Sequence, residues 1–338
     1  VFYGREDLSG VFDTAAGGQD VTVTGHPGDF LTIALTASDV NGDDVDDLLI
    51  GAAGASGPDG DRPTAGGVFV VTGAPDMKNV YLQQTPAHLT VYGAATGDNI
   101  PNHLAAGDLD GDGRDELIIG APMADGELRE DAGAIYIVPV PKDGGEIDLA
   151  YGNGFVRITG GARKDALGFQ VSSGDINDDG LDDLIAGARD ADGTGDAINN
   201  GGEVHVLFGK KDLPAGRDLL NSLSDVTITG GDPTDSVGFS VTGGDVNGDG
   251  ITDIITGAPV ADSCNNERED GGDAYAVFGR AGWPESIALQ GAGDLTYLGE
   301  EPGDDLGFSV ATGDFNGDGV ADVMLGALQA DGPDNSRP

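Results

Sequence analysis

Residues 245 to 253 read Asp245-Val-Asn-Gly-Asp-Gly-Ile-Thr-Asp253. The same pattern, with an acidic residue first, fifth and ninth and Asn or Asp third, occurs four more times, at Asp39–Asp47, Asp108–Glu116, Asp175–Asp183 and Asp314–Asp322. The first residues of these acidic loops are 67 to 70 residues apart. A fixed period indicates a repeat architecture with one supersecondary unit in each period.

The sequence around each acidic loop also repeats. An apolar run that ends in Gly-Ala follows every loop, and an alternating run such as Asp273–Phe278 and a short apolar stretch such as Leu295–Tyr297 come next in the complete repeats. Together with the stretch before the loop, this makes four short strands per repeat, bounded by Gly, Pro and Asp, with no helical period. We therefore predict an all-β fold, a β-propeller of four-stranded antiparallel blades. A linear β-solenoid would have a much shorter repeat, and a disordered chain would lack the apolar strands.

The two ends of the chain each contain half a repeat. Val1-Phe-Tyr-Gly-Arg5 matches the end of a third strand, Ala276–Arg280, and residues 21–24 match a fourth strand. Residues 307–327 supply only a first and a second strand. Pairing of the two halves would close a ring of five blades and remove exposed sheet edges. The alternative is part of a seven-bladed ring, in which the half-blades face neighbours outside this sequence.

These boundaries predict a single domain over residues 1–338. Its composite blade comprises residues 1–30 and 299–338, and the other blades cover about 31–98, 99–164, 165–234 and 235–298.

The repeats resemble the FG-GAP repeats of the integrin α-subunit propeller and of bacterial and archaeal integrin-like proteins. The resemblance rests on Gly-Phe, the acidic loop and Gly-Ala-Pro in that order, as in Gly238-Phe239, Asp245–Asp253 and Gly257-Ala-Pro259. The first two copies depart from it, since Thr32-Ile33 and Pro101-Asn102 replace Gly-Phe. The resemblance implies a propeller that binds protein ligands on one face.

The spacing of oxygen-bearing residues in the acidic loops predicts calcium sites. Side chains at positions 1, 3, 5 and 9 and the backbone carbonyl at position 7 can surround a hard cation, and Ca²⁺ takes six to eight oxygen ligands in flexible geometry. An EF-hand is excluded because its twelfth-position Glu and flanking helices are missing. Acidic hairpin turns without a metal are the alternative. We expect about five Ca²⁺ ions, held by Asp39, Asn41, Asp43, Val45, Asp47, Asp108, Asp110, Asp112, Arg114, Glu116, Asp175, Asn177, Asp179, Leu181, Asp183, Asp245, Asn247, Asp249, Ile251, Asp253, Asp314, Asn316, Asp318, Val320 and Asp322. Val45, Arg114, Leu181, Ile251 and Val320 would act through their backbone carbonyls.

The charge of the chain excludes several classes of function. Asp and Glu number 60 and Lys and Arg 16, which gives a net charge of −44. Such a charge repels phosphate backbones, so we expect no nucleic-acid binding. The single cysteine, Cys264, cannot form an internal disulfide, and no apolar stretch is long enough for a transmembrane helix.

No catalytic motif is found, so we predict a binding protein and not an enzyme. The loops after Gly-Ala differ between repeats, and variable loops on a repeating scaffold are where binding sites occur. They are residues 54–65, 123–131, 190–200, 260–270 and 329 onward. The predicted function is adhesion or protein–protein recognition outside the cytoplasm, where calcium is abundant, with the chain extracellular, on the cell surface or periplasmic. The partner would be a protein ligand or a neighbouring surface subunit. The alternatives are a module of a secreted enzyme that acts on polysaccharide or lipid, and a structural subunit of a surface assembly.

Overall fold

The computed structural model describes residues 1–4, 14–16, 18–151, 154–193, 199–213, 216–220, 224–263, 267–289 and 293–331. Cys264 and parts of the variable loops after the third, fourth and fifth Gly-Ala lie outside these residues. The described residues form strands and one short 3₁₀ helix, η1 (Thr14–Ala16). The predicted all-β class is confirmed.

Four strand positions recur along the chain, as the sequence predicts. First strands are β2 (Leu31–Ser38), β7 (Leu104–Gly107), β12 (Val171–Gly174), β17 (Ser240–Gly244) and β22 (Leu306–Gly313). Second strands are β3 (Asp47–Ala52), β8 (Glu116–Ala121), β13 (Asp183–Ala188), β18 (Asp253–Ala258) and β23 (Asp322–Ala327). Third strands are β4 (Gly67–Val71), β9 (Ala134–Val138), β14 (Glu203–Leu207) and β19 (Asp273–Val277). Fourth strands are β1 (Val23–Thr24), β6 (Leu89–Tyr92), β11 (Val156–Thr159), β16 (Val226–Thr229) and β21 (Leu295–Leu298).

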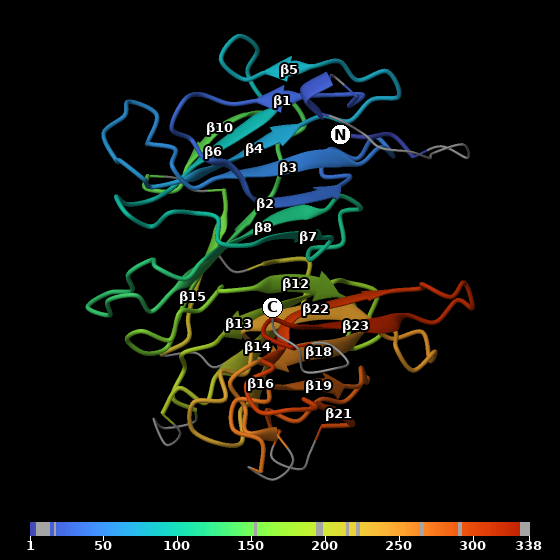
Figure 1. The fold of residues 1–338 in the computed structure, drawn as a ribbon. Coiled ribbons are helices and arrows are strands. Elements are labelled where there is room, and N and C mark those ends of the chain that lie inside the picture. The colour runs from blue at the N-terminus through green and yellow to red at the C-terminus, as the bar shows by residue number, and fades with distance from the viewer. Residues whose placement is uncertain are drawn as a thin grey trace.

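These strands make antiparallel, propeller-type blades, which Figure 1 shows as successive sheets. Each complete blade pairs its strands in the order first, second, third, fourth, as in β17-β18-β19-β21. The second and third strands are almost wholly buried, because neighbouring blades cover both of their faces. This explains why their sequences are nearly continuous apolar runs and do not alternate strictly.

A fifth, parallel strand covers the outer edge of several blades, and the sequence analysis did not foresee it. This capping strand comes from the following repeat, between its third and fourth strands. The capping strands are β5 (Val80–Tyr81) on β1, β10 (Gly145–Asp148) on β6, β15 (Gly216–Asp218) on β11 and β20 (Ser286–Ala288) on β16. Each capped edge is therefore held by its own blade and by the next repeat.

Glycines of the signature allow adjacent blades to approach closely. A Cβ atom on the Gly-Ala glycine Gly187 would lie 2.0 Å from the carbonyl oxygen of Gly238, the Gly-Phe glycine of the next repeat. Gly257 has the same relation to Gly307, at 2.0 Å. Any side chain at these positions would collide with backbone, so the repeated Gly-Ala and Gly-Phe pairs reflect this blade-to-blade contact.

The phenylalanines of the Gly-Phe pairs stack from blade to blade. The ring centroids of Phe169 and Phe239 are 5.1 Å apart, and those of Phe239 and Phe308 are 4.9 Å apart. The guanidinium of Arg189 lies 3.9 Å from the centroid of Phe169. The stack spans the repeats that keep Gly-Phe, which are the last three.

The predicted closure of the ring is not observed. Strands β22 and β23 form a two-stranded sheet, and the backbone of Val1 bonds to Asp20 and Val21 and not to β23. Figure 1 shows β1 and β5 at the top of the view, well apart from β22 and β23. In the complete repeats a glycine before the third strand, such as Gly272, lies against the next repeat, here at Leu306.

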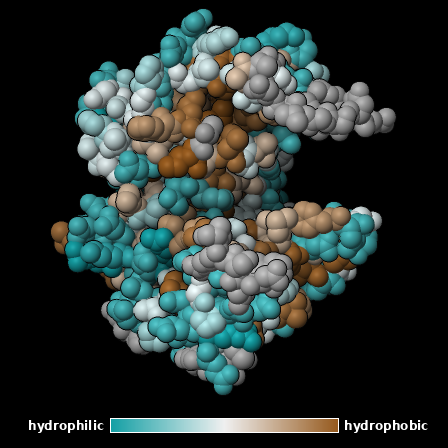
Figure 2. Space-filling model, viewed as in Figure 1, coloured by the Kyte–Doolittle hydropathy of each residue, from teal (hydrophilic) through white to brown (hydrophobic). Residues whose placement is uncertain are grey.

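The last half-blade is less buried than the complete blades. The last second strand, β23, is only partly buried, whereas the other second strands are buried. Met324 of β23 and Phe315 of the acidic loop before it are exposed, and Figure 2 shows hydrophobic surface in this part of the molecule.

Substitution of Gly187 by Val tests the blade contact. The new side chain collides with the backbone of Gly238, so we expect a loss of about 1–3 kcal/mol or more in the free energy of unfolding. Gly282→Ala is the control, because no atom lies within 4 Å of its added Cβ. Urea unfolding of both variants measures the difference, and equal stabilities would contradict the assigned contact.

Candidate metal centre

Each acidic loop joins the first strand of a repeat to the second. In the fourth loop, Asp245 Oδ1 accepts hydrogen bonds from the N–H groups of Gly248 (2.7 Å) and Asp249 (3.1 Å), and its Oδ2 accepts one from Gly250 (2.9 Å). The first-position carboxylate therefore folds the loop around itself. Equivalent bonds to the first-position Asp are present in the other loops.

The loop backbone is left-handed at two positions. In the fourth loop Gly248 has φ 76° and Gly250 has φ 89°. Asp takes the left-handed conformation at position 6 of the first loop (Asp44, φ 65°) and at position 4 of the third (Asp178, φ 61°). Asp tolerates this conformation better than most residues, so the turn keeps its form in both loops.

The ninth residue is the first residue of the second strand, and its carboxylate is buried in the first four loops. Asp253 Oδ1 accepts the N–H of Gly279 at the end of the third strand (2.8 Å), and Oδ2 accepts the N–H of Val246 (2.9 Å). In the first loop, Asp47 Oδ1 accepts the N–H of Gly73 (2.9 Å). This carboxylate thus links the loop, the second strand and the third strand.

Two buried oxygens in these loops have no hydrogen-bond partner. They are Asp47 Oδ2 in the first loop and Asn177 Oδ1 in the third, and both belong to the predicted ligand set. A buried acceptor without a partner costs free energy unless another group satisfies it. A hard cation in each of these two loops would satisfy its unpaired oxygen, so the residues present fit a divalent metal.

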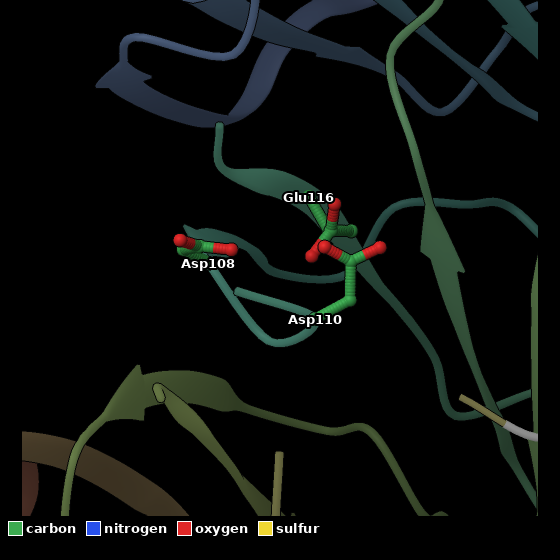
Figure 3. Close-up of side chains that lie close together, drawn as sticks. All are labelled: Asp108, Asp110 and Glu116. Carbon is green, nitrogen blue, oxygen red and sulfur yellow. The ribbon is translucent and has the colours of Figure 1, made fainter. Parts of the chain in front are cut away.

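The second loop brings three predicted ligands together. One carboxylate oxygen each from Asp108, Asp110 and Glu116 lies within 4.8 Å of the others. Figure 3 shows Asp110 beside Glu116, with Asp108 across the loop. The longer Glu116 side chain therefore reaches the cluster, although its Oε2 also accepts the N–H of Leu109 at 3.0 Å.

Burial and neighbouring charges raise the pKa values of the ninth-position carboxyls in the first four loops. Burial, and then repulsion from Asp110, raise the pKa of Glu116 to about 8. Burial raises the pKa of Asp183 to about 7, and it also raises the pKa of Asp47 and of Asp253. A cation in the loop would favour the ionised form of each group.

The first-position carboxyl of the fifth loop behaves in the opposite way. Hydrogen bonds from backbone N–H groups, that of Gly319 first, lower the pKa of Asp314. This carboxyl is ionised at neutral pH, so the loop presents a negative charge to a cation before any proton is displaced.

The remaining predicted ligands have varied surroundings. Asp112, the fifth residue of the second loop, pairs with Arg114 Nη2 at 2.6 Å, so a metal would compete with this ion pair. In the fifth loop Asp322 is only partly buried, because β23 has no third strand beside it among the described residues. The role of the seventh-position carbonyls stays a prediction.

Adjacent loops are joined to one another, and the sequence analysis did not foresee this. The N–H of the eighth residue donates to the first-residue carbonyl of the preceding loop, as from Thr252 to Asp175 (3.0 Å) and from Ala321 to Asp245 (2.8 Å). A Cβ atom on Gly111 would lie 2.6 Å from the side chain of Leu181, the seventh residue of the next loop. Glycine at position 4 therefore also makes room for the neighbouring loop.

Comparison with known proteins agrees with this arrangement. The FG-GAP repeat family matches residues 101–138, 167–207, 237–278 and 306–337. The chain is an FG-GAP repeat protein. The first acidic loop lies outside the matched segments, in the repeat where Thr32-Ile33 replaces Gly-Phe.

The FG-GAP protein is similar to two groups of curated proteins. It is 29% identical to integrin alpha-5 of Xenopus laevis over 64% of this chain and 20% of that protein. It is 26% identical to integrin alpha-PS2 of Drosophila melanogaster over 69% of this chain and 15% of that protein. It is 31% identical to the phosphatidylinositol-glycan-specific phospholipase D of Rattus norvegicus over 61% of this chain and 24% of that protein. The matched part is about a quarter or less of each relative's length.

The first strands of the FG-GAP protein surround a cavity of about 330 Å³. Its lining includes Thr36, His103, Gln170, Thr242 and Thr312, and the described lining residues include no Asp or Glu. No helix of the described residues has the length and apolar character needed to cross a membrane.

The raised pKa values give a pH dependence for the metal-free protein. Glu116 has a folded-state pKa of about 8 against an ordinary value of 4.5, so the folded state holds the extra proton between these values. The free energy of unfolding therefore falls as the pH rises through this range. We expect a lower Tm near pH 8 than near pH 6 in metal-free buffer.

The control is Glu116→Gln, which cannot titrate. The metal-free variant should lose less stability over the same pH range. Scanning calorimetry of both proteins at several pH values measures the effect. Parallel pH profiles for the two proteins would contradict the assignment to Glu116.

Proposed function

We propose that the FG-GAP protein is a calcium-stabilised, integrin-like propeller that recognises a protein partner outside the cytoplasm. The observation that carries the calcium part is the buried Asp47 Oδ2, an acceptor without a partner inside a loop of like charges. Ca²⁺ suits such a loop, because it accepts many oxygen ligands in irregular geometry. About five ions, one per acidic loop, would neutralise carboxylates that otherwise repel one another.

The bound ion would supply positive charge where a repeat's second strand begins. Hydrogen bonds of the chain itself join the surrounding parts. Asp253 accepts the N–H groups of Val246 and Gly279, and Thr252 donates its N–H to the preceding loop. The proposed role of the ion is therefore structural. It holds the first and second strands together and stabilises adjacent blades.

The recognition part rests on the variable loops, which lie at the ends of the blades opposite the acidic loops. The loop of the second repeat exposes Met123 and Leu128, and the side chain of Leu128 is fully exposed. Backbone hydrogen bonds between Gly126 and Arg129 hold its turn. Exposed apolar side chains on a fixed turn favour contact with a protein surface.

A second function remains a candidate because of the similarity to phospholipase D proteins. In it, the propeller is a module of a secreted enzyme that acts on lipid or polysaccharide. A structural role in a surface assembly would use the same loops on a neighbouring subunit. The similarity to integrin α subunits favours recognition as the first candidate.

A capture experiment tests the proposed function. The immobilised protein is incubated with surface proteins of its source in calcium and in chelator, beside the double variant Met123→Asp, Leu128→Asp. We expect a partner that is retained only in calcium and at least about tenfold less by the variant, as for central interface residues.

Lys142→Asp is the control, because Lys142 is exposed at the opposite end of the blade. Equal retention by wild type, double variant and control would contradict recognition through this loop. Turnover of a lipid or polysaccharide substrate by the isolated chain would favour the enzyme instead.

A further inference from the structure

The second repeat departs from the other complete repeats at four positions. Asp110 stands at the third position of its acidic loop, where the other loops have Asn. Arg114 stands at the seventh position, where the others have Val, Leu or Ile, and Glu116 replaces Asp at the ninth. Val140 follows the third strand, where the first, third and fourth repeats have Gly. The loop and the end of the third strand are hydrogen-bonded in those repeats, so the four changes concern one place in the blade.

A glycine after the third strand holds the acidic loop in the first, third and fourth repeats. The N–H groups of Gly73, Gly209 and Gly279 donate to the ninth-position carboxylates at 2.8 to 2.9 Å. A Cβ atom on these glycines would lie 2.1 to 2.4 Å from the carbonyl oxygen of the loop's eighth residue. Val140 carries a Cβ atom, so the second repeat cannot make this close approach. Among the described residues, Glu116 accepts a backbone N–H from its own loop only.

Arg114 makes the link between loop and third strand in the second repeat. Its Nη1 donates to the carbonyl oxygen of Val140 at 3.1 Å, and its Nη2 pairs with Asp112 Oδ2 at 2.6 Å. The stem of Arg114 lies against the preceding loop, since a Cβ atom on Gly42 would be 2.9 Å from its Cγ. The apolar seventh residues pack on the preceding loop in the same way. Arg114 therefore keeps the packing contact of this position and adds a link to the third strand.

This link occupies both carboxylate oxygens of Asp112, the fifth residue of the loop. Asp112 Oδ1 accepts the N–H of Arg114 at 3.0 Å, and Oδ2 is in the ion pair. In the fourth loop Asp249 Oδ1 accepts the N–H of Ile251 at 2.9 Å. No cationic side chain of the described residues pairs with Asp249 or with the other fifth-position residues, Asp43, Asp179 and Asp318. The oxygen that the fifth residue can offer to a cation in four loops is thus already bound in the second.

Asp110 supplies an oxygen in its place. The Nδ2 group of Asn247 donates to the ninth-position carboxylate at 3.3 Å, so the third residue of that loop has a single oxygen. Asp110 has two, of which Oδ1 accepts the N–H of Asp112 at 3.0 Å. Figure 3 shows Asp110 beside Glu116, and one oxygen each from Asp108, Asp110 and Glu116 lies within 4.8 Å of the others. Carboxylates this close favour a bound cation.

We propose that the second loop binds its cation through the side chains of Asp108, Asp110 and Glu116, while Asp112 is held by Arg114 and is not a ligand. Arg114 is a positioning residue, which joins the loop to Val140 through Asp112. The cation still meets three carboxylates, as it would in the other loops. The inference rests on the proposed calcium sites and gives one of them a different ligand set. The fifth-position Asp is therefore dispensable for binding in the second loop and required in the others.

The test compares Asp112→Asn with Asp249→Asn, the same substitution at the same position of the fourth loop. Titration calorimetry of the metal-free proteins counts the ions, and thermal scans in calcium and in chelator give the rise in Tm that calcium produces. Asp112→Asn should bind as many ions as the wild type and keep the full rise. Asp249→Asn should bind one ion fewer, with a smaller rise. Asp110→Asn should also lose one ion, because it removes the additional oxygen.

The role of Arg114 is tested in chelator, where no ion contributes. Arg114→Gln and Asp112→Asn should each lower the Tm by about 1–3 °C, and the double variant should lower it no further, because all three remove the same link. Arg163→Gln is the control, since Arg163 is exposed and pairs with Glu130. Additive losses in the double variant would overturn the assigned link.

The outcomes separate this inference from the proposed function. Loss of an ion by Asp112→Asn, or full ion binding by Asp110→Asn, would overturn the ligand set of the second loop and leave calcium binding by the other loops intact. A wild-type protein that binds no calcium would overturn the calcium part of the proposed function itself.

Discussion

The fold depends on a carboxylate at the start of each second strand, which is buried in the first four repeats. In the fourth repeat this group, Asp253, accepts N–H groups from its own loop and from the end of the third strand. It lies close to other carboxylates of the loop, and burial and their charges raise its pKa. A carboxyl in this position is either protonated or balanced by a cation. The acidic residues of the loops are understandable in these terms.

Contacts between repeats extend this local arrangement over the molecule. The loops bond to one another through backbone groups, the Gly-Ala and Gly-Phe glycines let blades approach, and the capping strands link each repeat to the preceding one. Repeat proteins gain much of their stability from such nearest-neighbour contacts. A substitution that destabilises one acidic loop should therefore also destabilise the neighbouring loops, which would not happen if the repeats were independent.

The sequence was sufficient to predict the features that recur with the period. The strand order and the loop positions follow from residue types at fixed spacing. The capping strands were not predicted, because they are short, vary in sequence and pair with the preceding repeat. The closure of the ring is not observed among the described residues and stays a prediction: matching half-repeats identify complementary strands, but β23 and Val1 are not paired. The pairing of Asp112 with Arg114 was also missed, since it depends on a rotamer and not on spacing.

The most direct test of the account is the number of calcium ions bound by the folded chain. Isothermal titration of metal-free protein, together with anomalous scattering from crystals grown in calcium, gives both the number and the positions of the ions. The account predicts about five ions, one in each acidic loop, and a higher Tm in calcium than in chelator. Two or fewer ions in saturating calcium, or a Tm that calcium leaves unchanged, would contradict it.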